Sequence, residues 1–191
     1  MYTWMRNTHL LLGLSTLWFI LMYAVSSVQM AHPRWFRAHP DVAETTYALP
    51  ANLDGARPAA RELMDGHGLR GELSDVRPGP QLVRFRIVRP GTVYEVAYTP
   101  ASGEAKVRTN TAAFMGMLNR IHHVQGIWHE YGLINVWGAF VGVVSIALIG
   151  MALTGIYMWF KLHKERVTGG AILAASLVYG IGLMIAIRMG Q

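Results

Sequence analysis

Three long stretches of the chain contain no Asp, Glu, Lys or Arg and are rich in apolar side chains. They cover residues 7–33, 131–160 and 167–187, and they are 27, 30 and 21 residues long. A helix needs about 20 mostly apolar residues to cross the hydrocarbon core of a bilayer. The pattern argues strongly against a wholly soluble protein. It predicts transmembrane helices over residues 9–30, 131–160 and 169–187.

The first of these helices is expected to be an uncleaved anchor rather than a signal peptide. Its apolar core is longer than the about 7–15 residues of a signal-peptide core. No Ala-x-Ala cleavage pattern follows it. Residues 1–8 then form a short N-terminal tail on one side of the membrane.

Residues 31–130 differ from the rest of the chain, because they hold 12 basic and 10 acidic residues. About one hundred residues suffice for a small domain with its own core. Apolar and polar positions alternate over 82–88 and 93–98, as in half-buried strands, with turn signals at 90–91 and 100–103. We also expect a strand over 104–108, a helix over 59–64 that ends at Gly66, and a helix from near Thr111 that continues through MGMLNRIHHVQGIW toward the second span.

The loop between the second and third predicted spans indicates the orientation. Residues 161–168 carry Lys161, Lys164 and Arg166, and positive charge in a short loop marks the cytoplasmic side. We therefore expect a cytoplasmic N-terminus, an extracytoplasmic domain over 31–130, and a C-terminal tail, residues 188–191, that also lies outside. In a bacterium this describes a multi-pass inner (plasma) membrane protein whose domain is periplasmic or extracellular.

Small residues recur at four-residue spacing in two predicted spans, at Gly138 and Gly142 and at Ala171 and Ala175. Such spacing lets helix backbones approach closely. It fits internal packing of the three helices, or docking of other membrane subunits within the lipid bilayer. No Asp, Glu, Lys or Arg lies inside a predicted span, which disfavours an ion or proton pathway.

The composition excludes several kinds of chemistry. The 191 residues include no cysteine, which excludes thiolate catalysis, disulfides, iron–sulfur clusters and cysteine zinc sites. The formal net charge is +6, but no cluster of Lys and Arg with interleaved aromatics indicates nucleic-acid binding. No phosphate loop, dinucleotide fingerprint or nucleophilic triad is visible, so no complete active site is predicted.

Histidines near the predicted membrane boundaries are the candidate chemistry. His9, His32, His122 and His129 lie close to span ends, and two histidines on facing helices can ligate one haem b. No metal other than haem iron is expected. The alternative is that these histidines simply lie at the level of the lipid headgroups. We expect no ligand role for His39, His67 and His163, and His163 lies in a basic loop where any polar residue would serve.

Helix geometry narrows the pairings. Gly13 follows His9 by one turn, and Gly126 follows His122 by one turn, which would leave room for a flat macrocycle. His122 and His129 are seven residues apart and would share one helix face. His9 and His32 are 23 residues apart, about 35 Å along a helix, whereas His129 and His163 are 34 residues apart, about 51 Å. Two straight parallel helices cannot match both pairs, so either the second span is tilted or broken, or at most one haem site exists. We favour an outer site, formed by His32 with His122 or His129, and His123 is a reserve candidate. A zinc site at His122, His123, His129 and Glu130 is weaker, because the spacing is not that of a metalloprotease.

Four segments together resemble a known family. The opening THLLLGL, the segment YEVAYTPASGEAKV, the helix approach NRIHH and the exit LTGIYMWFKL are similar to the PepSY-associated transmembrane helix family, as one minimal unit with an extra C-terminal helix. The resemblance implies a small α+β PepSY-like extracytoplasmic domain between helices 1 and 2. It also implies haem ligation at His9 and His122, as in haem-bearing reductases, or an accessory role without a cofactor.

The expected fold is an integral membrane α-helical protein, with three transmembrane helices and the PepSY-like domain. The expected function is a haem b-binding electron-transfer subunit of a membrane redox system, which at most is the membrane part of an oxidoreductase. The alternative is a non-catalytic accessory or regulatory subunit, whose domain binds a partner. The third span lacks histidine, and no flavin or nicotinamide module is present, so a complete reductase is not expected.

Overall fold

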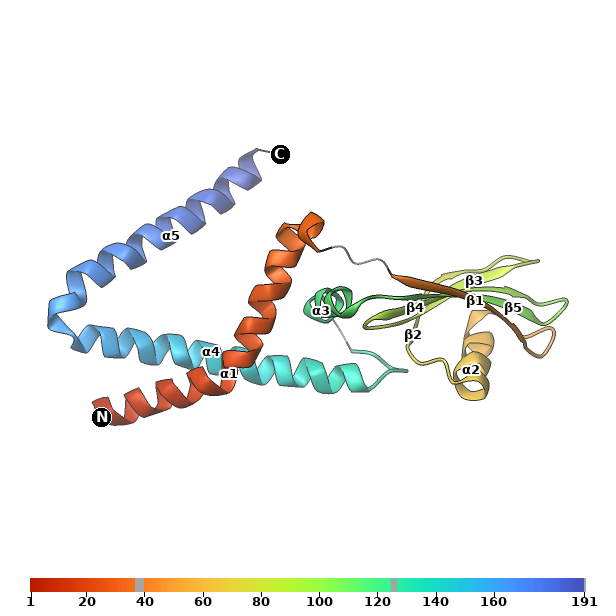
Figure 1. Ribbon diagram of the computed structural model, residues 1–191, viewed down its shortest axis with the longest axis horizontal. Helices are drawn as coiled ribbons and strands as arrows, with labels where there is room; N and C mark the ends of the chain where they lie inside the picture. The colour runs from red at the N-terminus through yellow and green to blue at the C-terminus, as the bar shows by residue number, and fades with distance from the viewer. Residues whose placement is uncertain (37–39, 125–126, 191) are drawn as a thin grey trace. The chain divides into compact units, whose positions relative to one another are not determined.

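The computed structural model describes residues 1–36, 40–124 and 127–190. Long helices and one five-stranded sheet make up most of these residues (Figure 1). The chain divides into two compact units. One unit is Phe19–Gly142, which includes the sheet, and the other combines Met1–Trp18 with Val143–Gln191.

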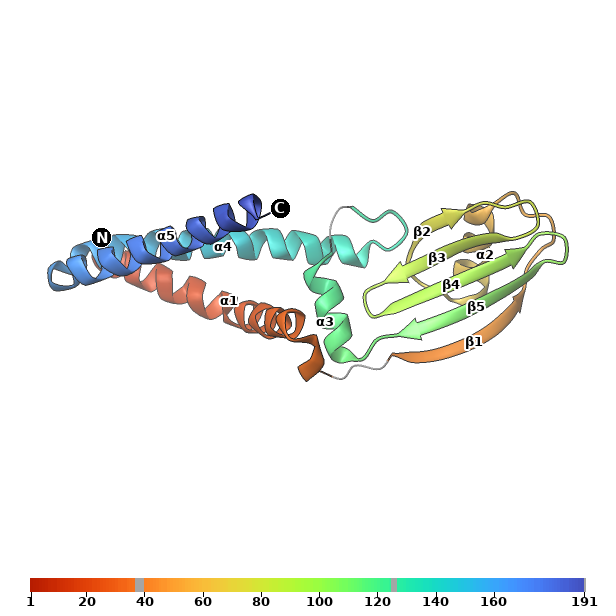
Figure 2. The ribbon, with the colours of Figure 1, turned by 90° about the horizontal axis from the view of Figure 1, so that it is seen from above.

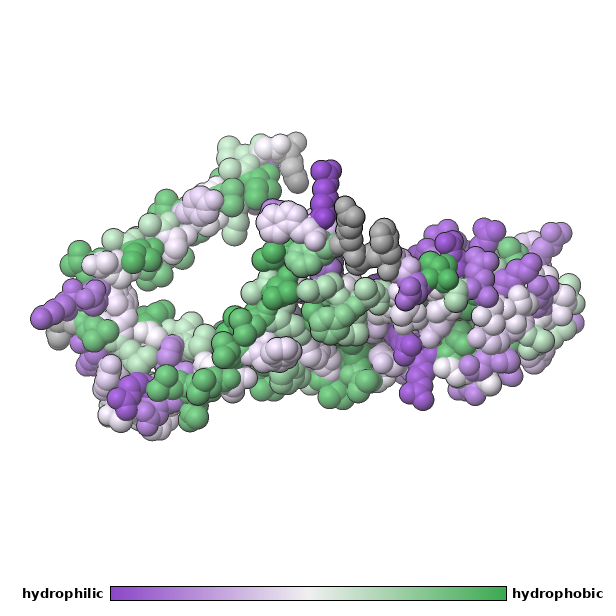
Figure 3. All heavy atoms as spheres, viewed as in Figure 1, coloured by the Kyte–Doolittle hydropathy of each residue, from purple (hydrophilic) through white to green (hydrophobic). Residues whose placement is uncertain are grey.

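Within the described residues, three helices are long and apolar enough to cross a membrane, as their length and composition show. They are α1 (Tyr2–Ala31), α4 (Leu133–Lys161) and α5 (Arg166–Met189), and short 3-10 turns follow α1 at Pro33–Trp35 and precede α5 at His163–Glu165. Hydrophobic residues gather over these helices and hydrophilic residues over the sheet (Figure 3). The prediction of three candidate membrane helices is confirmed.

The sheet is antiparallel throughout and has the strand order β1-β5-β4-β3-β2 (Figure 2). The predicted strands correspond to β3, β4 and β5, and the turns between them place Gly91 and Gly103 at φ 86° and 71°. The sequence did not predict the two edge strands, β1 and β2. The strands are β1 (Asp41–Ala48), β2 (Glu72–Arg77), β3 (Val83–Arg89), β4 (Thr92–Thr99) and β5 (Glu104–Thr111).

Helix α2 (Ala56–His67) covers one face of the sheet and closes the core of this domain. Leu63 of α2 packs in one cluster with Phe85, Ile87 and Tyr98, all of which are fully buried or nearly so. The prediction that this helix ends at Gly66 was wrong. It ends at Gly68, which adopts φ 72° and donates its N–H to the carbonyl of Leu63, as a left-handed helix cap does.

The helix that approaches the second span is shorter than expected. Helix α3 covers Phe114–His122, and the described residues 127–132 between it and α4 are not helical. Side chains satisfy the backbone of this segment instead: the N–H of Trp128 donates to Asn135 Oδ1 at 2.9 Å, and Asn135 Nδ2 donates back to the Trp128 carbonyl at 2.7 Å. The prediction that His122 and His129 share one helix face was therefore wrong.

Candidate functional site

His122, the last residue of α3, contacts the face of α1. Its Nδ1 lies 2.7 Å from the Oγ of Ser26, which is buried, and its ring lies 4.1 Å from the ring of Tyr23 between centroids. Tyr23 in turn stacks on Phe19 at 4.3 Å. Polar and aromatic side chains of α1 thus surround one edge of a single imidazole.

One tautomer of His122 leaves Nε2 free to bind a metal. The Ser26 hydroxyl has one hydrogen, which it can donate to the carbonyl of Tyr23 at 3.0 Å, and Ser26 Oγ then accepts from His122 Nδ1–H. In this tautomer Nε2 keeps its lone pair, and it has no hydrogen-bond partner among the described residues. A metal-binding histidine has this arrangement, because its second nitrogen donates to an acceptor that orients the ring.

The charge state of His122 also suits ligation. Burial lowers the pKa of this imidazole, and the neighbouring His123 lowers it further. The shift favours the neutral ring at pH 7, and only neutral imidazole can bind a metal.

A cavity of about 430 Å³ lies beside His122. Tyr23, Trp137 and Asn135 line it together with Gly138, where an added Cβ would meet no atom within 4 Å. Ligand pockets usually measure about 300–1,000 Å³ and are mostly apolar. The cavity therefore has the size for part of a planar ligand beside His122, and both polar and apolar atoms line it.

His9 has a comparable arrangement in the other compact unit. Its Nδ1 lies 3.0 Å from the carbonyl oxygen of Met151 and 3.1 Å from Thr154 Oγ1 on α4. A carbonyl can only accept, so Nδ1 carries the proton and Nε2 keeps its lone pair. The His9 ring lies against Gly155, where an added Cβ would come within 3.3 Å of Cε1. The predicted gap beside Gly13 is instead occupied by Met151, whose sulfur would lie 3.6 Å from an added Cβ.

The structure keeps the other candidate histidines apart from these two sites. His32 stacks on Trp35 at 4.1 Å, and His129 is exposed, with Nδ1 3.6 Å from Glu72 Oε1. No contact joins His32 to His122 or to His129 within the described ranges. His123 adjoins His122 and places Nε2 2.8 Å from the sulfur of Met30. His39 and Gly126 lie outside the described residues.

The residues present fit haem in part. His122 and His9 each offer one oriented nitrogen, but the described contacts bring no second histidine from another element to either one. No three His, Asp or Glu side chains gather as a metal site in the described part of the chain, so the zinc alternative has no support there. The arrangement can supply one histidine ligand at each position, with a cavity beside His122.

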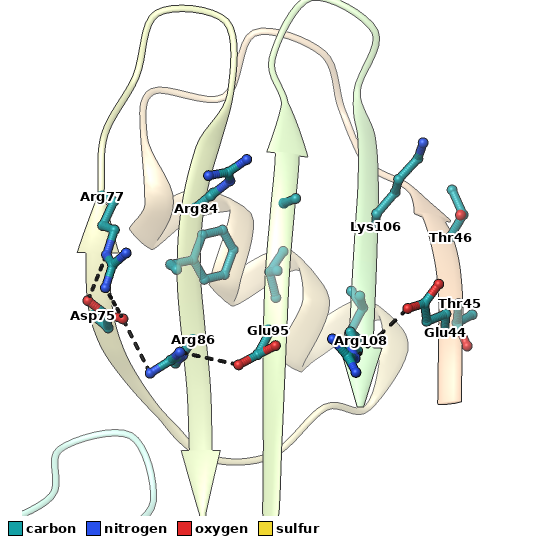
Figure 4. A pocket seen from close by; sticks show the side chains of 14 residues that line it. Glu44, Thr45, Thr46, Asp75, Arg77, Arg84, Arg86, Glu95, Lys106 and Arg108 are labelled. Atoms are coloured by element: carbon teal, nitrogen blue, oxygen red, sulfur yellow. Dashed lines mark hydrogen bonds and ion pairs between the residues drawn. The ribbon is translucent and has the colours of Figure 1, made fainter. Parts of the chain in front are cut away.

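The open face of the sheet carries basic and acidic residues side by side. A hollow of about 600 Å³ there contains Arg77 paired with Asp75 at 3.1 Å, and Arg86 paired with Asp75 and Glu95 at 3.4 and 3.2 Å (Figure 4). Basic residues outnumber the acidic ones among its lining, but these ion pairs neutralise several of them.

Sequence reasoning missed the residues of α1 that contact the histidines of α3. Phe19, Tyr23, Ser26 and Met30 follow one another at spacings of four, three and four, which places them on one helix face. That spacing could have identified the face. It could not have shown that the face contacts His122, because 96 positions separate Ser26 from His122.

Comparison with known proteins supports the resemblance noted in the sequence. A family model described as "Putative PepSY_TM-like" matches residues 3–189. No curated protein and no solved structure matches the chain. The family match covers the sheet and all three long helices, and it confirms what four short segments had indicated.

Proposed function

This chain belongs to the PepSY_TM-like family, and from that premise we propose that it is a haem b-binding electron-transfer subunit of a membrane redox system. The observation that carries the proposal is the hydrogen bond of 2.7 Å between His122 and Ser26. It orients the imidazole beside a cavity lined by Tyr23 and Trp137, and the tautomer that donates from Nδ1 keeps Nε2 free to bind a metal. The coarser conclusion, a membrane protein of this family, does not depend on the haem.

The chain's own residues would prepare the site in three ways. Haem b, when bound, supplies an iron that changes oxidation state by one electron. His122 would bind the iron, and Ser26 would hold its ring in position through the hydrogen bond to Nδ1. Trp137 and Tyr23 line the cavity and would exclude water from it. His9, oriented by Met151 and Thr154, is the second candidate ligand.

This assignment gives the chain one axial ligand at each histidine. The subunit would thus hold a haem alone or help a partner subunit to hold one. His32 and His129, expected from the sequence as partners of His122, remain candidates without a supporting contact.

A second function is favoured by a different observation. Both His9 and His122 use Nδ1 to join one helix to another, which a purely structural histidine also does. An added Cβ at Gly138 or Gly142 would meet no atom within 4 Å, and Ala171 and Ala175 are exposed. An accessory subunit without a cofactor would dock a membrane partner on these small-residue faces.

Alanine variants of three histidines separate the two functions. The full chain is expressed in cells supplied with haem, purified in detergent, and its haem is measured per chain. We expect His122→Ala to lose haem more severely than the about 10- to 100-fold effect of removing an outer-shell partner, and His9→Ala to lose it if that site is used. His67→Ala is the control, because His67 contacts Tyr47 in the sheet domain. A colourless wild-type protein would favour the accessory function, whereas full haem in His122→Ala would show that His122 is not the ligand.

We further propose that the protein lies in a bacterial inner membrane with its N-terminus in the cytoplasm and the sheet domain outside. The basic residues Lys161, Lys164 and Arg166 between α4 and α5 support this orientation. The sheet domain is then the PepSY-like part of the protein.

A further inference from the structure

A second cavity, of about 670 Å³, lies between the β3–β4 turn and one side of α3. Arg89 reaches it from the end of β3, and Asn119, Arg120 and His123 reach it from α3. No Asp or Glu among the described residues lines this cavity. Its charged lining is therefore positive, whereas acidic residues lie among the basic ones on the open face of the sheet.

Arg89, which lines this cavity, has an unsatisfied Nε. It is buried and has no hydrogen-bond partner in the described structure. A buried charged donor without a partner is costly, so native structures usually supply an acceptor from protein, water or ligand. Neither Arg89 nor Arg120 forms an ion pair with a described residue. Both guanidinium groups thus lack the carboxylate that commonly neutralises such groups.

The first turn of α3 adds to the positive potential. Ala112, Ala113 and Gly116 line the same cavity, and Ala113 at the N-cap makes no side-chain hydrogen bond. The free N–H groups of a helix N-terminus attract anions, and no side-chain carboxylate caps them here. This contribution is independent of the two arginines.

From these observations we propose that the cavity binds a phosphate- or carboxylate-bearing ligand, with Arg89 and Arg120 as its charged contacts. Arginine suits this role because its planar donors match the oxygens of both groups. The inference concerns a site other than the haem site and goes beyond the proposed function.

Two sources could supply this oxyanion. His123 lines the cavity and contacts Met30, the second-last residue of α1. The cavity is therefore close to the end of a candidate membrane helix, where the headgroup of an anionic phospholipid would reach it. A soluble phosphate compound would use the same donors. The two sources differ in whether acyl chains contribute to binding.

The test uses the full chain in detergent and follows its thermal unfolding and its tryptophan fluorescence, since Trp128 also lines the cavity. One arm adds sodium pyrophosphate at constant ionic strength, with chloride as the reference. The other arm adds phosphatidylglycerol, with uncharged diacylglycerol as the reference. The double variant Arg89→Gln/Arg120→Gln is compared with Arg57→Gln/Arg61→Gln, which removes two exposed charges from α2.

We expect saturable binding in at least one arm and about ten-fold or greater weakening in the Arg89/Arg120 variant, with the α2 variant unchanged. Response to phosphatidylglycerol alone assigns the site to a lipid headgroup, and response to pyrophosphate assigns it to a soluble anion. If the double variant does not fold, Arg120→Gln alone, at an exposed position, should still weaken binding several-fold. The absence of saturable binding in both arms, or equal binding by all variants, would overturn the inference. None of these readouts depends on haem.

Discussion

Ser26 Oγ and His122 Nδ1 lie 2.7 Å apart, which joins the buried face of α1 to the last residue of α3. When the Ser26 hydroxyl gives its own hydrogen to the carbonyl of Tyr23, its oxygen accepts from the imidazole. The contact then does two things at once. It ties two helices together, and it leaves Nε2 of the neutral ring without a proton.

Replacement of Ser26 tests whether this contact supports a ligand. In Ser26→Ala, His122 Nδ1 loses its acceptor, and the ring becomes free to change tautomer and orientation. We expect about 10- to 100-fold weaker haem retention, as for other outer-shell partners, measured as haem per chain after dilution and washing.

The neighbouring serine provides the control for that experiment. Ser27 is exposed on α1, so Ser27→Ala removes the same group without touching His122. Equal haem content in the two variants would show that the Ser26–His122 hydrogen bond does not support haem binding.

Glu72 and Glu130 each accept hydrogen bonds from the backbone of the other's segment, and together they hold the segment that leads into α4. The N–H groups of His129 and Glu130 donate to the two carboxylate oxygens of Glu72 at 3.1 and 2.7 Å. The N–H of Leu73 donates to Glu130 Oε2 at 3.0 Å. The exposed edge of β2 is thereby covered by residues 129–130.

Glu72→Gln should loosen this segment, because one carboxylate oxygen becomes an amide NH₂ that faces a backbone donor. We expect a loss of about 1–2 kcal/mol in the free energy of unfolding of the sheet domain, and faster hydrogen exchange at His129 and Glu130. Glu44→Gln is the control, since its exposed carboxylate lies 3.9 Å from Arg108 and such pairs contribute little. Unchanged exchange at residues 129–130 in Glu72→Gln would contradict this account.

The sequence predicted the elements whose signals are local. Charge-free apolar runs predicted the three long helices, and alternation between the turns at Gly91 and Gly103 predicted β3, β4 and β5. Every one of these signals depends on residues close together in the chain.

The features that the sequence did not predict depend on distant partners. Most of β1 is exposed, with Tyr47 half-buried as the exception. The strand therefore shows no alternation of apolar and polar residues. It is held in the sheet by pairing with β5, more than 50 positions later. The helix after Thr111 stops at His122, and the next segment is bound by Glu72, 57 positions before His129. The pairing of His122 with Ser26 is likewise non-local.

Helix packing at His9 can be tested at Gly155. A Cβ added at Gly155 would lie 3.3 Å from Cε1 of His9. A leucine side chain would collide with this ring, so Gly155→Leu should separate α1 from α4. We expect a lower unfolding temperature in detergent and a cost of about 1–3 kcal/mol. Gly142→Leu is the matched control, because nothing lies within 4 Å of an added Cβ there. Equal stability of both variants would mean that His9 does not pack on Gly155.

The proposed orientation can be tested with single cysteines, because the chain has none of its own. Ser102 and Thr168 are both exposed, in the β4–β5 turn and after the basic loop. A membrane-impermeant maleimide should label Ser102→Cys in intact cells or spheroplasts, and Thr168→Cys only after permeabilisation. The reverse pattern would invert the topology and place the sheet domain in the cytoplasm.

The most direct test of the proposed function is a reduced-minus-oxidised optical spectrum of the purified wild-type protein, with iron quantified against protein. The account predicts the bands of a haem b with about one haem iron per chain. Protein from haem-supplied cells that shows no such bands and no iron would contradict it, and would leave His122 and Ser26 as a helix-packing contact of an accessory subunit.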